Sequence, residues 1–177
     1  RTPVYYALGN HDNRELWAKV MGSDHFTPSG FYAYTFLVGG CRNIVLDTLS
    51  PGQVSGYIAR EQLVWCREIL ENEMRPVFLF LHHSPLPVGI PWIDRLMLEN
   101  ASDLLRLVED FPQIRGVFSG HVHRYHCCQR GSTWFVTSPA LSVRFGPDPD
   151  AKVVPGPPGF LDVTFARDRL QITPHFF

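Results

Sequence analysis

Six of the eight histidines in this chain of 177 residues fall in or beside three short polar turns. They are His11, His82, His83, His121, His123 and His126. Neutral imidazole binds zinc, iron, manganese and related ions, and an Asn carbonyl such as that of Asn10 is a harder oxygen donor. The gathering of these residue types predicts a metal centre.

Each of the three turns directly follows a short hydrophobic run. Residues 4–8 (VYYAL) precede GNHD, residues 77–81 (VFLFL) precede HHSP, and residues 116–119 (GVFS) precede GHVH. Near-continuous apolar runs of this length are typical of strands buried on both faces of a sheet. Loops at the carboxyl ends of such strands converge on one crevice, where ligands bind. We therefore expect the three turns to meet.

Each motif also has a simpler interpretation when it is taken alone. The Asn and Asp of GNHD could cap backbone groups of a turn, His82 and His83 could be the polar end of a buried strand, and most isolated HxH pairs bind no metal. All three together favour a metal site. Glycines at 9 and 120 are expected to permit tight turns there. In a turn, the spacing of His121 and His123 could aim their rings at neighbouring ions.

His25, His175 and His126 have ordinary explanations. His25 sits in a polar loop and His175 near an expected frayed end, so both are interpreted as surface groups. His126 follows the HxH turn on an expected strand and is interpreted as an outer or surface residue.

The elements between the motifs indicate an α/β fold. Helices are expected over residues 61–71 and 101–109, the second with Asn100 as its N-cap. Antiparallel hairpins are expected at Gly39-Gly40, at residues 130–132 and, with a weaker turn signal, at residues 167–168. Residues 146–159 are too rich in Pro and Gly for regular structure and are expected to form a surface loop. The pattern suggests an α/β sandwich with helices facing its sheets.

The composition of the chain limits which kinds of binding partner are expected. The chain has 45% hydrophobic and 19% charged residues and a formal net charge of −1, so we expect one globular domain and neither a nucleic acid nor a membrane as partner. The four cysteines fall in no CxxC spacing. They are interpreted as reduced thiols of a cytoplasmic protein.

The order of GNHD, HHxP and GHVH resembles the calcineurin-like metallophosphoesterases. Further matches at residues 6–12, 81–89, 91–94, Asn100 and 120–123 are similar to bacterial class III cyclic-nucleotide phosphodiesterases. The resemblance implies an α-β-β-α sandwich of mixed sheets. It also implies hydrolysis of a small phosphodiester, cyclic AMP in particular, by attack of a metal-bound hydroxide on phosphorus.

The resemblance also assigns residue roles. Asn10, His82 and His121 would bind one metal ion and His123 the other. His11 would approach the substrate phosphate and assist the leaving oxygen, with Asp12 orienting its ring. His83 would lie beside the site and could contact the substrate.

Two motifs of the family, Asp-x-His and Gly-Asp, are expected before GNHD and are not in this chain. We therefore expect a single domain over residues 1–177 that lacks the first strands of its parent. The parent would hold two ions of iron, manganese or zinc, and this chain one or fewer tightly. An exposed sheet edge would make a homodimer possible. The alternatives are a catalytically incomplete fragment that folds or binds a partner, a glycerophosphodiesterase, and a nuclease of the same superfamily, which the near-neutral charge disfavours.

Overall fold

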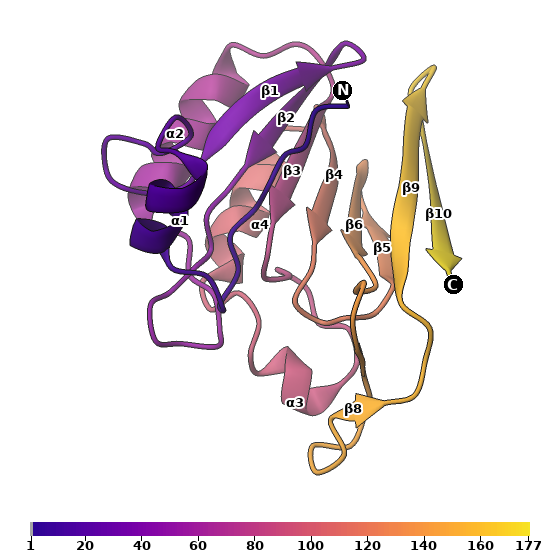
Figure 1. Cartoon of the computed structure of the whole chain (residues 1–177). Coiled ribbons are helices and arrows are strands. Elements are labelled where there is room, and N and C mark those ends of the chain that lie inside the picture. The colour runs from indigo at the N-terminus through magenta and orange to yellow at the C-terminus, as the bar shows by residue number, and fades with distance from the viewer. Residues whose placement is uncertain (1) are drawn as a thin grey trace.

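The computed structural model describes residues 2–177, which form a mixed sheet with two of the helices packed on one face (Figure 1). The helices are α1 (Arg14–Met21), α2 (Arg60–Glu71), α3 (Pro91–Asp94) and α4 (Ala101–Asp110). The strands are β1 (Tyr34–Val38), β2 (Cys41–Val45), β3 (Val77–Leu81), β4 (Ile114–Ser119), β5 (His126–Arg130), β6 (Thr133–Thr137), β7 (Arg144–Phe145), β8 (Val153–Val154), β9 (Gly159–Ala166) and β10 (Arg169–Phe176). The predicted α/β class is confirmed.

Six strands form the main sheet in the order β1-β2-β3-β4-β6-β5. The central strands β2, β3, β4 and β6 run parallel, and the edge strands β1 and β5 are antiparallel to their neighbours. Because β3 and β4 are parallel neighbours, the turns that follow them leave the same edge of the sheet. This register places HHSP and GHVH side by side.

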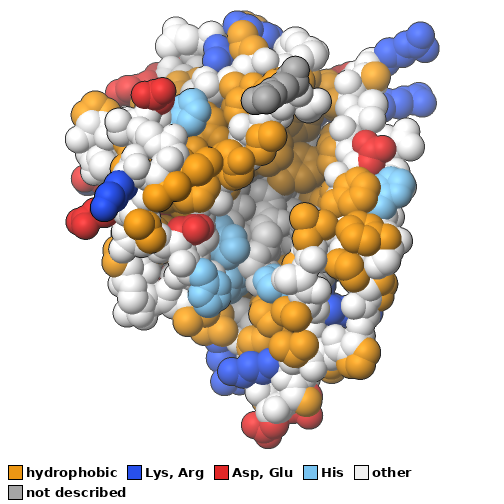
Figure 2. All heavy atoms as spheres, viewed as in Figure 1, with side chains coloured by type: hydrophobic (Ala, Val, Ile, Leu, Met, Phe, Trp, Pro, Cys, Tyr) orange, Lys and Arg blue, Asp and Glu red, His pale blue; other side chains and the backbone are white. Residues whose placement is uncertain are grey.

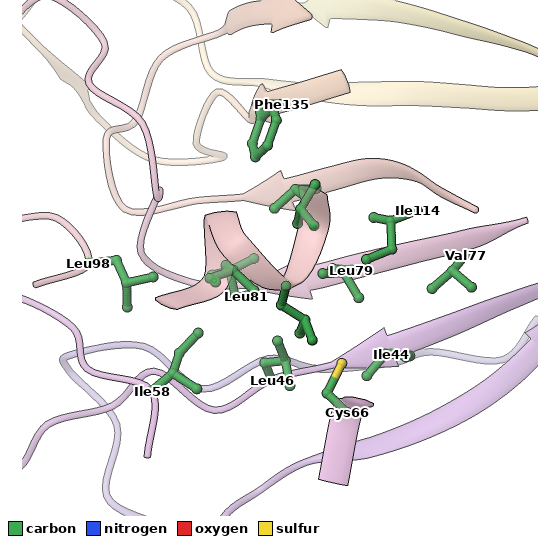
Figure 3. Packing of buried hydrophobic residues seen from close by; sticks show 14 of the residues in the cluster. Ile44, Leu46, Ile58, Cys66, Val77, Leu79, Leu81, Leu98, Ile114 and Phe135 are labelled. Atoms are coloured by element: carbon green, nitrogen blue, oxygen red, sulfur yellow. The ribbon is translucent and has the colours of Figure 1, made fainter. Parts of the chain in front are cut away.

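The largest core fills the space between the sheet and the helices α2 and α4. Figure 3 shows side chains of the central strands, such as Leu79 and Ile114, packed with Cys66 of α2. On the opposite face, Phe78 and Phe118 pack against the hairpin β9–β10 through Phe165. The long hairpin thus covers part of the second face of the sheet, as Figure 1 shows. No helix among residues 2–177 is long and apolar enough to cross a bilayer.

The expected strand over residues 4–8 is wrong. These residues form no ladder with another described strand, and the side chains of Val4, Tyr5 and Tyr6 are exposed. The segment lies against β1 through side chains instead: the Tyr34 hydroxyl accepts from the Tyr6 amide and donates to the Tyr6 carbonyl, at 2.8 and 2.9 Å. The ring of Tyr5 also stacks on Phe36. Strand propensity cannot produce a strand without a neighbouring backbone to pair with.

Other local expectations are corrected in detail. Asn100 occupies the predicted N-cap position of α4, but its side chain forms no capping hydrogen bond and instead bonds the backbone N–H and C=O of Ile58. Part of residues 146–159 is regular, since β8 pairs with β7. His175 lies within β10 rather than in a frayed end. A helix not expected from the sequence, α1, begins after Asn13, whose Oδ1 accepts from the Leu16 amide.

The hairpin at Gly39-Gly40 is confirmed. Both glycines have positive φ, 57° and 78°, as a two-residue turn between right-twisted strands requires. All four cysteines are free thiols.

Candidate metal centre

Three polar side chains from distant parts of the chain meet beyond the ends of β3 and β4. The Nε2 atom of His82 lies 3.0 Å from Oδ1 of Asn10, and Nδ1 of His121 lies 3.3 Å from each of these two atoms. Figure 2 shows histidine side chains gathered near the lower end of a hollow, whose walls carry hydrophobic side chains. The convergence of the three turns predicted from the sequence is thus present at the level of individual atoms.

Hydrogen bonds alone do not satisfy this triangle. Oδ1 of Asn10 only accepts, and each imidazole nitrogen carries at most one hydrogen. Three contacts between these atoms therefore share at most two hydrogens. A cation at the centre could be coordinated by all three atoms at once, through the lone pair of each. Metal–nitrogen bonds of about 2.0–2.1 Å put ligands at 90–109° about 3.0–3.4 Å apart, so the observed separations fit one coordination sphere.

The protonation states suit the same chemistry. Burial, followed by the charges of neighbouring histidines, lowers the pKa of His82 to about 3. Burial and the charge of His83 lower the pKa of His121 to about 4, although a hydrogen bond to the backbone of Leu96 acts in the opposite direction. Both rings are therefore neutral near pH 7, which is the state that binds a metal.

Two glycines lie beside the triangle, and neither has a positive φ. The expected turn at Gly9 is present, since the Gly9 carbonyl accepts from the Asp12 amide at 3.1 Å. A Cβ on Gly9 would lie 2.8 Å from the ring of His82, so this position needs glycine for space. A Cβ on Gly120 would lie at 3.5 Å from the same ring, an ordinary contact. The left-handed backbone is found instead at His121 and His123, with φ of 63° and 52°. Non-glycine residues rarely adopt this conformation, and it is concentrated at functional sites.

The side chain of His123 contacts residues outside this triangle. Its Nδ1 donates to the Val143 carbonyl at 2.8 Å, and its ring stacks on Phe145 with centroids 4.2 Å apart. The bond to a carbonyl fixes the tautomer and leaves the Nε2 lone pair free, an arrangement common among metal-binding histidines. Burial also lowers the pKa of His123, against the effect of the Val143 bond.

His83 is fully buried, and both its ring nitrogens are occupied. Nε2 bonds the Val54 carbonyl at 3.0 Å, and Nδ1 lies 2.8 Å from the Thr48 hydroxyl. Because Nε2 must carry the hydrogen for a carbonyl, Nδ1 accepts from Thr48. His83 is therefore close to the triangle but has no free lone pair for a metal or a substrate.

His11 and Asp12 lie beside Asn10 in the same turn. His11 is exposed. Asp12 folds back, and its Oδ2 accepts from the Gly9 amide at 2.7 Å. Among the described residues the His11 ring forms no hydrogen bond with Asp12. Asp12 instead closes the turn by accepting from the Gly9 amide, which agrees with the simpler interpretation of GNHD as a capped turn.

Asp47 and Thr48, which follow β2, are a polar pair that the motif search missed. The buried carboxylate of Asp47 forms an ion pair with Arg14 at 2.7 Å and accepts from the amides of Tyr32 and Leu49. Thr48 holds His83. Their position after a parallel strand is the same signal that marked the histidine turns, and it could have found them.

Replacing Thr48 by valine is expected to lower the free energy of unfolding by about 1–3 kcal/mol, because Nδ1 of His83 is left buried without a partner. Thr48→Ser keeps the hydroxyl and is the matched control. Denaturant unfolding of the three proteins measures the difference. Because valine keeps the methyl group and serine keeps the hydroxyl, a loss in Thr48→Val no larger than that in Thr48→Ser would contradict the role given to the hydroxyl.

Comparison with known proteins agrees with this geometry. Residues 1–125 match the family model described as calcineurin-like phosphoesterase, so the chain belongs to the calcineurin-like phosphoesterase family. It is 33% identical over 147 residues to the 3',5'-cyclic adenosine monophosphate phosphodiesterase CpdA of Pseudomonas aeruginosa, covering 82% of this chain and 52% of that protein. A 3',5'-cyclic-nucleotide phosphodiesterase of Nostoc is 29% identical, with 80% and 52% covered.

The chain thus spans about half the length of these relatives. Among solved structures, a dimetal phosphatase from Danio rerio superposes with a TM-score of 0.76 at 14% identity, covering 97% of this chain and 69% of that one. At this identity the superposition shows the fold. The family implies divalent metal ions.

Proposed function

We propose that this chain carries part of the active site of a metal-dependent phosphodiester hydrolase that acts on 3',5'-cyclic nucleotides, with cyclic AMP as the substrate. The observation that carries the proposal is the triangle of Asn10, His82 and His121, whose donor atoms lie 3.0–3.3 Å apart. The names of the Pseudomonas and Nostoc relatives supply the substrate class.

Asn10, His82 and His121 would hold one divalent cation, and Nε2 of His123 would serve a second. Mixed nitrogen and oxygen ligands accept iron, manganese or zinc. When bound, such cations neutralise charge that develops on phosphoryl oxygens and lower the pKa of a coordinated water. Because one metal has three donors here and the other has one, we propose that this chain holds one ion or fewer tightly.

His11 is proposed to reach the substrate phosphate. Its ring is exposed beside Asn10, so it is free to donate a hydrogen bond to the leaving oxygen, while Asp12 fixes the turn through the Gly9 amide. Asp12 would thereby orient His11 through the backbone.

His11→Ala is expected to lower kcat about 100-fold while metal content stays unchanged, since general acid catalysis contributes about 10²–10⁴. Steady-state kinetics and metal analysis of the same preparation measure both quantities. His25→Ala, another exposed histidine, is the matched control. Undiminished kcat in His11→Ala would remove this residue from the mechanism.

The whole proposal is tested by assaying the chain with added manganese against cyclic AMP, a glycerophosphodiester and a chromogenic phosphodiester. Faster turnover of cyclic AMP supports the cyclic-nucleotide assignment, and preference for the glycerol compound replaces it. Bound metal without turnover of any diester would leave this chain an incomplete site. We also propose a cytoplasmic location, which the four free thiols support, since reduced cysteines are usual in reducing compartments.

A further inference from the structure

A pocket of about 270 Å³ opens beside His123. It lies where the turn after β4, the segment before β7 and the end of β10 come together. Its lining residues are His123, Arg124, Tyr125, Pro139, Ala140, Val143, Arg144, Pro157 and Phe176. Whole small-molecule sites are usually about 300–1,000 Å³. The pocket therefore suits one ring system rather than an entire nucleotide.

The walls of the pocket combine apolar surfaces with hydrogen-bond donors. Pro139, Ala140, Val143, Pro157 and Phe176 supply the apolar part. Arg124, Tyr125 and Arg144 also line the pocket, and their side chains carry the polar groups, namely two guanidinium groups and a hydroxyl. A free phosphate would meet too much apolar surface here, whereas a planar heterocycle has apolar faces and polar edges.

The two arginines have unused donors. Across residues 2–177 neither Arg124 nor Arg144 forms an ion pair with a carboxylate. Arg124 donates from Nη1 to the Phe145 carbonyl at 3.1 Å, which leaves its other N–H groups available. Arg144 packs over Gly156, where a Cβ would lie 2.8 Å from its Cδ. The absence of a side chain at Gly156 thus makes room for Arg144 at the pocket.

Several carbonyl groups of the lining residues already accept a hydrogen bond. The Val143 carbonyl accepts from Nδ1 of His123 at 2.8 Å, and the Ala140 carbonyl accepts from the Gly159 amide at 2.9 Å. The pocket therefore presents mainly donors, and its ligand should present mainly acceptors. The ring nitrogens N7 and N3 of a purine are such acceptors.

We propose that this pocket binds the purine base of the substrate, with Arg124 and Arg144 donating to its ring nitrogens. The inference rests on the proposed function, because the base enters here only if the phosphate lies at the neighbouring histidines. The pocket shares His123 with that site. Arg124 and Arg144 are then specificity-determining residues of a nucleotide phosphodiesterase.

The first test compares cyclic AMP with a chromogenic phosphodiester that has no base. In Arg144→Gln, the ratio of kcat/KM for cyclic AMP to that for the base-free diester is expected to fall about 10-fold, mainly through KM for cyclic AMP. Ala140→Phe, which fills the pocket, is expected to lower the ratio similarly. Arg130→Gln, on an exposed part of β5, should leave the ratio unchanged. An unchanged ratio in both pocket variants overturns the inference, while any turnover of cyclic AMP leaves the proposed function intact.

The second test needs no turnover. Calorimetry in manganese buffer compares adenosine 5'-monophosphate with ribose 5-phosphate, which share the phosphate and differ in the base. The unaltered chain is expected to bind the first about 10-fold more tightly, and Arg144→Gln to remove the difference. That result in a chain without hydrolytic activity supports the base pocket and shows that the site of this chain is catalytically incomplete. Equal binding of the two compounds, or binding of neither, overturns the base pocket.

Discussion

Alanine at position 9 is expected to weaken manganese binding by at least about 100-fold and to lower turnover by at least about 1,000-fold. A Cβ at this position would lie 2.8 Å from the His82 ring, so the ring must move out of the triangle. Structural metal sites with four ligands gain about 10–16 kcal/mol, which is about 3 kcal/mol for each ligand. Losing one donor therefore costs at least two orders of magnitude in affinity.

Gly120→Ala is the matched control for this prediction. It adds the same methyl group to a neighbouring turn, but the new Cβ would lie 3.5 Å from the His82 ring. Manganese affinity is expected to stay within about threefold. Calorimetric titration of both variants with manganese measures the affinities, and circular dichroism checks that each is folded. Equal affinity in Gly9→Ala and the unaltered chain would contradict the placement of His82 as a ligand.

The metal-free chain is expected to lose stability steeply between pH 6.5 and pH 4.5. His82, His83 and His121 have pKa values lowered mainly by burial, to about 3, 4 and 4, against about 6.5 in the unfolded chain. Above pH 6.5 both states are neutral and the stability is complete. As the pH falls below 6.5, the unfolded chain takes up protons that the folded chain does not, so unfolding becomes more favourable.

The size of this effect follows from the number of protons. Each proton bound only by the unfolded chain contributes about 1.4 kcal/mol per pH unit, so three give roughly 4 kcal/mol per unit. Folded domains have only about 5–15 kcal/mol in total. Urea unfolding in the presence of a chelator, at steps from pH 7 to 4.5, measures the slope. The variant His175→Asn, altered at an exposed position, should show the same slope. A free energy that changes by less than about 1 kcal/mol from pH 6.5 to 5 would contradict the prediction.

Local signals in the sequence predicted many elements correctly. The apolar runs at β3 and β4, the helical spacing of α2 and α4 and the Gly39-Gly40 turn depend on neighbouring residues, and the structure has all of them. The same reasoning failed over residues 4–8, because a strand needs a partner whose presence local propensity does not encode. At Asn100 it predicted the N-cap position but not the bonds of the side-chain amide to the Ile58 backbone, 42 residues away.

The candidate site also has features that the sequence predicts and features that depend on the tertiary structure. The sequence by itself determined that imidazoles follow the ends of two buried strands and that an Asn carbonyl follows a third apolar run, because residue type and apolar pattern are local properties. Only the tertiary structure decided which of them meet. Parallel pairing of β3 and β4 brings His82 and His121 together with Asn10, whereas the Thr48 and Val54 contacts remove His83 from the donor set. The physical reason is that a coordination sphere depends on atoms a few ångströms apart in space, and those atoms here come from positions 72 and 111 residues apart in the chain.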